Sequence, residues 1–228
     1  NLNVGIDTTG KAYNSNDVYV MNGSKTSDGA YFYQSGNLYK NVSCRNLFKK
    51  GYMQQNFYVL NTYNSNECGT KSGSYEIYNS NGEKAINKSF TSVQIFDENG
   101  LAIVSEDGKN YYLLNTKGEQ VGGNYDKIFL RDGYYMTTKD KLEGIIDKNG
   151  VEILPCEYKD VYTTNFSGDV VARVTISDSE YMVYNVDTKK EIIKSTTKPD
   201  TAHEHYFITS ENNKKQYYTY NGKMVLEK

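Results

Sequence analysis

Two histidines separated by a single residue are the first side chains that could do chemistry. His203 and His205 are the only histidines in the chain. On a β-strand, residues two positions apart share a face, so both imidazoles could bind one metal ion, with Asp200 or Glu211 completing the site. The competing interpretation is a solvated loop, because Lys198-Pro199 precedes the pair. We favour the loop and expect no bound metal, and we keep His203 and His205 as the candidate ligands.

Other catalytic motifs are weak. Asp147-Lys148-Asn149-Gly150 superficially has the form of a calcium-binding loop, but the position where that loop needs a glutamate holds Cys156. No Gly-x-Ser-x-Gly motif occurs, and Gly122-Gly123 does not precede a helix as a phosphate-binding loop would. No two of the 28 acidic residues stand out as a glycosidase pair. We expect a protein that is not an enzyme and has no cofactor.

The three cysteines have no metal-binding or redox spacing. A disulfide between Cys44 and Cys68 is one interpretation, and three unpaired thiols, Cys156 included, is the other. The chain begins with Asn1 and shows no signal peptide, which we interpret as a leader already removed, although a trimmed chain would look the same. On this basis we expect an extracellular or cell-envelope location.

Tyrosine is the residue in surplus, with 23 copies. Consecutive tyrosines on a strand place one ring on each face of the sheet. One ring of each pair should fill the core, and the other should offer rigid contact area to a protein or a sugar. Cross-strand pairing of the outward rings is an equally weighted alternative without a binding role. The candidates for a binding face are Tyr111, Tyr112, Tyr134, Tyr135, Tyr217 and Tyr218.

The composition excludes several classes of partner. The formal net charge is −2 and basic residues are scattered singly or in pairs, so there is no electrostatic footprint for nucleic acid. No apolar run approaches the roughly 18 residues of a membrane-spanning helix, so we expect no membrane insertion. The hydrophobic fraction of 37% is low, but tyrosine rings add apolar area. A packed core is therefore expected rather than disorder.

Short β-strands joined by tight turns must position these side chains. Asn-Gly pairs, which are typical of two-residue hairpin turns, recur between short apolar or aromatic segments, and no segment sustains the 3.6-residue period of a helix. The sequence therefore predicts an all-β protein. The residues expected to form structural turns are Asn81, Gly82, Gly118, Asn149, Gly150, Asn221 and Gly222.

One hairpin pattern recurs along the chain, with glycines spaced by 36 and then 32 residues at Gly82, Gly118 and Gly150. Self-similarity at such a period indicates stacked antiparallel β-meander units, each too small to bury its own face. A propeller-like closed form is favoured over an open curved array, because closure hides edge strands. We predict one repeat domain, 1–228, with units at about 1–30, 31–73, 74–107, 108–140, 141–178 and 179–212 and a terminal hairpin at 213–228.

Residues 142–161 carry a family resemblance. Ile146-Asp147-Lys148-Asn149-Gly150, followed by Ile153-Leu154-Pro155 and Tyr158-Lys159-Asp160-Val161, resembles the hairpin and second strand of a WG repeat, a bacterial repeat named for a Trp-Gly pair. Glu143 stands where the family has tryptophan. The resemblance implies a recognition or scaffold module rather than an enzyme.

The residues of this motif also have readable physical roles. Asn149-Gly150 should supply both positive-φ positions of the turn, and Pro155 should end the second strand or lie at an edge. Tyr158 and Val161 should cap the core of the unit. The motif is therefore mainly structural.

We therefore expect a monomeric, non-enzymatic module that binds another macromolecule through a tyrosine-rich face, with a protein favoured over a glycan. Carbohydrate or cell-wall binding is one alternative, although tyrosine-rich sugar-binding repeats are shorter, about 20 residues, and contain tryptophan. A structural spacer without any ligand is the other.

Overall fold

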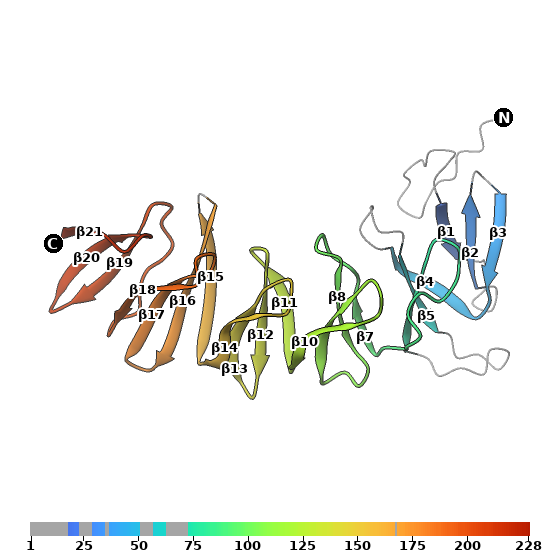
Figure 1. The fold of residues 1–228 in the computed structure, drawn as a ribbon, viewed down its shortest axis with the longest axis horizontal. Coiled ribbons are helices and arrows are strands. Elements are labelled where there is room, and N and C mark those ends of the chain that lie inside the picture. The colour runs from blue at the N-terminus through green and yellow to red at the C-terminus, as the bar shows by residue number, and fades with distance from the viewer. Residues whose placement is uncertain (1–17, 23–28, 35–36, 51–56, 63–72, 167) are drawn as a thin grey trace. The chain divides into compact units, whose positions relative to one another are not determined.

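The computed structural model describes residues 18–22, 29–34, 37–50, 57–62, 73–166 and 168–228. Within these ranges every regular element is a β-strand, and the strands form consecutive antiparallel sheets along the chain (Figure 1). The predicted all-β repeat fold is confirmed. The described part contains no helix able to span a membrane. Chain contacts divide the protein into an N-terminal unit, residues 1–121, and a C-terminal unit, residues 122–228.

The N-terminal unit contains two three-stranded sheets and most of a four-stranded one, whose last strand crosses into the C-terminal unit. Buried apolar side chains of the second and third sheets, Ile77, Phe90 and Leu114 among them, form one core cluster. The strands are β1 (Val18–Asn22), β2 (Ala30–Gln34), β3 (Asn37–Val42), β4 (Arg45–Lys50), β5 (Tyr58–Thr62), β6 (Tyr75–Tyr78), β7 (Ser92–Gln94), β8 (Leu101–Ser105), β9 (Tyr111–Asn115) and β10 (Gln120–Tyr125).

Glu76 on β6 is a buried carboxylate at the centre of a charged cluster in the N-terminal unit. It accepts hydrogen bonds from Arg45 Nε at 2.7 Å and Lys84 Nζ at 3.1 Å, and from the hydroxyls of Tyr78 and Ser89. Burial by itself raises the pKa of Glu76, but the hydrogen bonds from Arg45 and Lys84 outweigh it and lower the pKa to about 2. The carboxylate is therefore ionised at neutral pH and paired.

The C-terminal unit contains two four-stranded sheets and one three-stranded sheet, each ordered as in the sequence. Leu154 and Ile145 of one sheet share a core cluster with Val161 and Val170 of the next, so each sheet buries its apolar face against its neighbour. The strands are β11 (Lys127–Arg131), β12 (Tyr134–Lys139), β13 (Leu142–Ile146), β14 (Glu152–Tyr158), β15 (Asp160–Phe166), β16 (Asp169–Ser177), β17 (Glu180–Asn185), β18 (Lys190–Ser195), β19 (Tyr206–Glu211), β20 (Lys214–Thr219) and β21 (Met224–Glu227).

The recurring hairpin differs from the predicted turn. Gly150 has a φ of +74°, but Asn149 is not among the residues with positive φ, so the prediction of two positive-φ positions is wrong. The loop instead runs from Asp147 to Val151, whose backbone groups pair, and Asp147 Oδ1 accepts the amides of Asn149 at 2.8 Å and Val151 at 2.9 Å. This is a three-residue loop with a left-handed glycine, started by an aspartate side chain that replaces backbone partners.

The same loop closes the hairpins that contain Gly82, Gly118 and Gly222. Asn79 and Asn115 cap their loops with the side-chain oxygen, as Asp147 does, and Thr219 uses its hydroxyl. The glycines predicted as turn residues all have positive φ, namely Gly82, Gly118, Gly150 and Gly222. The true two-residue turns lie elsewhere, for example at Asp140-Lys141 and Asn212-Asn213, where both residues have positive φ.

The sheets are out of phase with the predicted repeat units. The predicted boundaries at 107, 140, 178 and 212 fall in hairpins between two strands of one sheet. The chain passes from the β11–β14 sheet to the β15–β18 sheet through a single residue, Lys159. Such a short passage has no turn signature in the sequence. The predicted units 108–140 and 141–178 therefore each take two strands from each of two sheets.

Candidate recognition surface

Most of the six candidate tyrosines use their rings or hydroxyls in contacts within the protein. Tyr135 is fully buried, and Tyr112 is 6% exposed, with its hydroxyl donating to Glu106 at 2.7 Å. Tyr134 is half-buried, and its hydroxyl donates to Asp187 at 2.5 Å. In these two doublets one ring therefore enters the core, and the second is at most half-exposed.

The remaining candidates lie at the edges of the core. Tyr111 is half-buried on β9. Tyr217 is half-buried, with its ring 5.9 Å from that of Tyr206, and Tyr218 stacks on Phe207 at 5.4 Å. These contacts are of the cross-strand kind, which leaves little ring area for a partner.

The exposed aromatic side chains of the described residues are instead Phe129 and Tyr162, at 37% and 39% exposure. Tyr162 lies on β15 between two arginines. The guanidinium of Arg131, from β11 of the neighbouring sheet, is 4.1 Å from the ring centre, and that of Arg173, from β16, is 5.0 Å away. Cations at this distance are attracted to the face of the ring.

Phe129 extends this arrangement along β11. Lys127 Nζ lies 5.2 Å from the centre of the Phe129 ring, and Lys127, Phe129 and Arg131 share one face of the strand because they are two residues apart. We call the five side chains Lys127, Phe129, Arg131, Tyr162 and Arg173 the aromatic–cationic strip. Three cations gather here in a chain of negative net charge.

Two carboxylates of the β11–β14 sheet hold β15, which carries Tyr162, in place. Glu143 Oε2 accepts the backbone amide of Val161 at 2.8 Å, and Asp132 Oδ2 accepts the hydroxyl of Thr163 at 2.7 Å. Asp132 also lies 3.5 Å from Arg131 Nε. The side chains of the strip therefore come from two sheets, and hydrogen bonds at Val161 and Thr163, on either side of Tyr162, connect these sheets.

The remaining sequence candidates do not form a site. His203 Nε2 is 3.2 Å from Asp200 Oδ2, and the ring stacks on Tyr206 at 4.6 Å. His205 is exposed. In the described part of the chain, no group of three or more His, Cys, Asp or Glu side chains is placed to hold a metal ion.

The cysteines have different states. Cys44 is disulfide-bonded and Cys156 is a free thiol, whereas Cys68 lies outside the described residues. Burial raises the pKa of Cys156, so its reactive thiolate form is disfavoured at neutral pH.

The sequence does contain a signal for the strip. Residues 127–131 alternate Lys127, Phe129 and Arg131 with apolar residues, a period of two that marks an outward aromatic and basic face. The meeting of Arg131 with Tyr162 has no such signal, because it depends on how two sheets pack.

The comparisons with known proteins agree with the repeat architecture. The family profile of the WG-containing repeat matches residues 77–109 and 144–178. No curated protein matches the sequence closely enough to count as a relative.

Solved structures resemble the chain only distantly. BamB from Moraxella catarrhalis has 14% identity and a TM-score of 0.36, with coverage of 99% of this chain and 72% of that one. Hsv2 from Kluyveromyces lactis has 9% identity and a TM-score of 0.39, with coverage of 88% and 72%. A eukaryotic initiation factor has 12% identity and a TM-score of 0.49, with coverage of 100% and 64%.

The second profile match begins at Gly144, directly after Glu143, and ends at Asp178, so it covers strands of both sheets that form the aromatic–cationic strip. In a fold of consecutive antiparallel sheets, this chain therefore contains two segments that match the WG-containing repeat.

Proposed function

We propose that this protein is a non-enzymatic recognition module that binds an acidic, extended segment of another protein through the aromatic–cationic strip. The observation that carries the proposal is Tyr162, an exposed ring held between Arg131 and Arg173 from two different sheets. Tyrosine and arginine are the residues that most often dominate binding energy at protein interfaces. Their pairing here needs no partner to form, so little ordering cost remains at binding.

The charges of the strip favour an acidic partner. The two arginines of the strip form only loose ion pairs. The distance from nitrogen to carboxylate oxygen is 3.5 Å between Arg131 and Asp132 and 3.8 Å between Arg173 and Asp160. Such partly exposed pairs contribute little, so a carboxylate of a partner can compete for either guanidinium with better geometry. Nucleic acid is disfavoured by the overall charge of −2.

The edge of β15 favours docking by side chains rather than by strand addition. β15 pairs only with β16, and an edge strand of this kind usually invites another strand. Here the carboxylate of Glu143 already accepts the Val161 amide at 2.8 Å. An added strand would have to displace it, whereas the two rings and the guanidinium of Arg131 stay partly exposed.

The test is a selection of random linear peptides, displayed on phage, against the full chain. We expect enriched peptides to be acidic, and we expect Arg131→Ala and Tyr162→Ala each to weaken their binding at least tenfold. Lys148→Ala, which removes an exposed cation from a turn outside the strip, is the matched control and should leave the affinity unchanged.

Two results would overturn the proposal. One is a set of peptides whose affinity is the same for parent, Arg131→Ala and Tyr162→Ala. The other is a selection that yields no binding peptides. Thermal unfolding of each variant checks that a loss of binding is not a loss of fold, and the exposure of Tyr162 makes a severe defect unexpected.

A further inference from the structure

The passage from β18 to β19 interrupts the repeat. β14 continues into β15 through Lys159 alone, whereas residues 196–205 separate β18 from β19. The last sheet has three strands, and beside β19 the intervening segment makes one isolated bridge, between Asp200 and Ile208. Breaks in an otherwise consistent pattern are the places where functional sites are expected.

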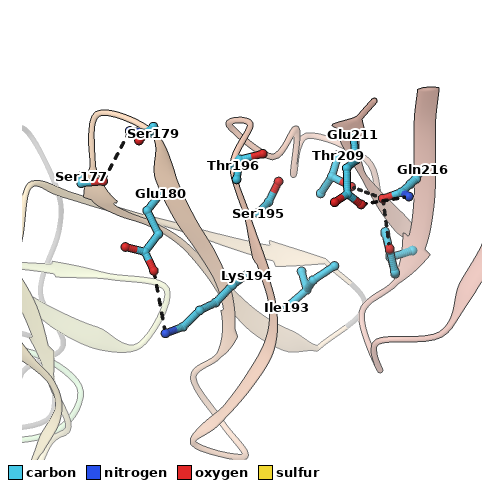
Figure 2. A pocket seen from close by; sticks show the side chains of 11 residues that line it. Ser177, Ser179, Glu180, Ile193, Lys194, Ser195, Thr196, Thr209, Glu211 and Gln216 are labelled. Atoms are coloured by element: carbon cyan, nitrogen blue, oxygen red, sulfur yellow. Dashed lines mark hydrogen bonds and ion pairs between the residues drawn. The ribbon is translucent and has the colours of Figure 1, made fainter. Parts of the chain in front are cut away.

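A cavity of about 450 Å³ lies at this interruption, between β16–β18 and the pair β19–β20. Its volume falls in the range of small-molecule sites. In Figure 2, Glu180 and Lys194 of one sheet lie across the cavity from Glu211 and Gln216 of the other, with Ser195 and Thr196 between them. The cavity shares no residue with the aromatic–cationic strip.

The wall formed by the last sheet is fixed by hydrogen bonds around Gln216. The side-chain oxygen of Gln216 accepts from the hydroxyls of Thr209 at 3.4 Å and Tyr218 at 3.2 Å. Its amide nitrogen donates to Glu211 at 3.4 Å and to Glu227 at 3.3 Å. Because Thr209 is buried, this polar network holds its orientation before any ligand arrives.

The opposite wall supplies a row of polar groups. Glu180 and Lys194 are 4.0 Å apart, a loose and exposed ion pair. The hydroxyls of Ser179, Ser195 and Thr196 lie along the same side. Each can act as donor or acceptor, so this wall can match a ligand whose own groups are hydroxyls.

We propose that this cavity binds a neutral saccharide of one or two sugar units. Carboxylate, amide and hydroxyl groups on both walls can hydrogen-bond adjacent sugar hydroxyls, and Ile193 offers apolar area for the C–H face of a pyranose. Two carboxylates against one lysine disfavour anionic ligands such as phosphate. The described residues offer no cluster for a metal ion, and the polar walls do not suit an apolar ligand.

The test is an NMR titration of the full chain with glucose, galactose, N-acetylglucosamine and the disaccharides cellobiose and maltose. We expect at least one sugar to give saturable shifts of backbone amides at Ser177–Glu180, Ser195–Thr196 and Thr209–Glu211, with a dissociation constant in the millimolar range. Inorganic phosphate and spermidine are titrated in parallel and should give no saturable shifts at these amides.

Variants assign the binding to the cavity. Glu211→Gln removes a carboxylate of the wall, and Ser179→Trp places a ring over the mouth from an exposed turn, so each should weaken binding at least fivefold. Glu191→Gln, on β18 outside the cavity, is the matched control and should change nothing.

The proposal is overturned if none of the sugars gives saturable shifts, if phosphate or spermidine alone binds, or if both cavity variants bind sugar as the parent does. Because the peptide selection uses other residues, its failure and the failure of this proposal are separate results.

Discussion

Two junctions between neighbouring sheets of the C-terminal unit are built in different ways. The junction of β11–β14 with β15–β18 has a one-residue passage, Lys159, and side-chain ties across it, among them Glu143 to Val161. The junction of β15–β18 with β19–β21 has a long passage, residues 196–205, and a cavity of about 450 Å³. Where the repeat is kept, the surface carries the aromatic–cationic strip, and where the repeat is interrupted, a cavity opens.

Gly144 shows what the regular junction requires of the sequence. A Cβ at this position would lie 2.5 Å from the carbonyl oxygen of Leu154 and 2.8 Å from the carbonyl carbon of Pro155. The register of β13 with β14 shifts between Glu143 and Ile145, so the β14 backbone passes over the glycine. The absence of a side chain at Gly144 therefore allows β13 and β14 to pack closely.

The largest expected effect comes from Gly144→Ala. The methyl group must push the β14 backbone away, and overpacking of this kind costs about 1–3 kcal/mol. Urea unfolding should show a clear loss of stability. Gly133→Ala is the comparison: Gly133 has a φ of +82° but open space around it, so the substitution should cost only the strain of a left-handed alanine, about 1–2 kcal/mol. Equal stability of Gly144→Ala and parent would contradict the account of this junction.

The next largest effect should come from Asp187→Asn. Asp187 accepts the hydroxyl of Tyr134 at 2.5 Å and the amide of Val170 at 2.6 Å, and so ties β12 to the neighbouring sheet. Loss of the charge weakens both hydrogen bonds, by about 1–2 kcal/mol together. Asp169→Asn removes a nearby exposed carboxylate and should be neutral in the same unfolding experiment. If the two variants were equally stable, the tie would be energetically unimportant.

High pH should weaken the same tie. Burial and the hydrogen bond to Asp187 raise the pKa of Tyr134 to about 12 from an ordinary value of 10. The contribution to stability is therefore complete below pH 10 and is lost as the pH rises to 12, because the unfolded chain ionises first. The difference in melting temperature between parent and Tyr134→Phe should shrink over this range. A difference that stays constant from pH 9 to 12 would count against the tie.

The smallest effect is expected at the interrupted junction. The hydroxyl of Tyr220 donates to the carbonyls of Thr201 at 3.1 Å and His203 at 2.7 Å, inside the long passage. Tyr220→Phe should cost only about 0.5–1 kcal/mol but should speed amide exchange in residues 200–208. Unchanged exchange there would show that other contacts hold the passage.

The sequence is informative about local structure and silent about packing between sheets. Asn-Gly spacing predicts the hairpins, and Gly82, Gly118, Gly150 and Gly222 all have the expected positive φ. The turn type is missed because the capping of Asp147 on its own loop competes with the two-residue turn.

The candidate site is harder to predict for a physical reason. Tyrosine doublets indicate one inward ring, as at Tyr112 and Tyr135, but alternation cannot say whether the second ring meets solvent or a neighbouring sheet. Tyr134 meets Asp187, 53 positions away, and Arg131 meets Tyr162. The role of Glu143 could not be predicted from the sequence either, because its partner, the backbone amide of Val161, lies on the edge strand of the next sheet.

The most direct measurement is hydrogen–deuterium exchange of the full chain, with and without a selected acidic peptide at saturating concentration. We expect slower exchange in residues 127–131 and 160–164, the strands that carry Phe129, Arg131 and Tyr162, and no change at residues 177–180 or 209–216 around the cavity. Slower exchange at the cavity or along β21, with β11 and β15 unchanged, would contradict this expectation.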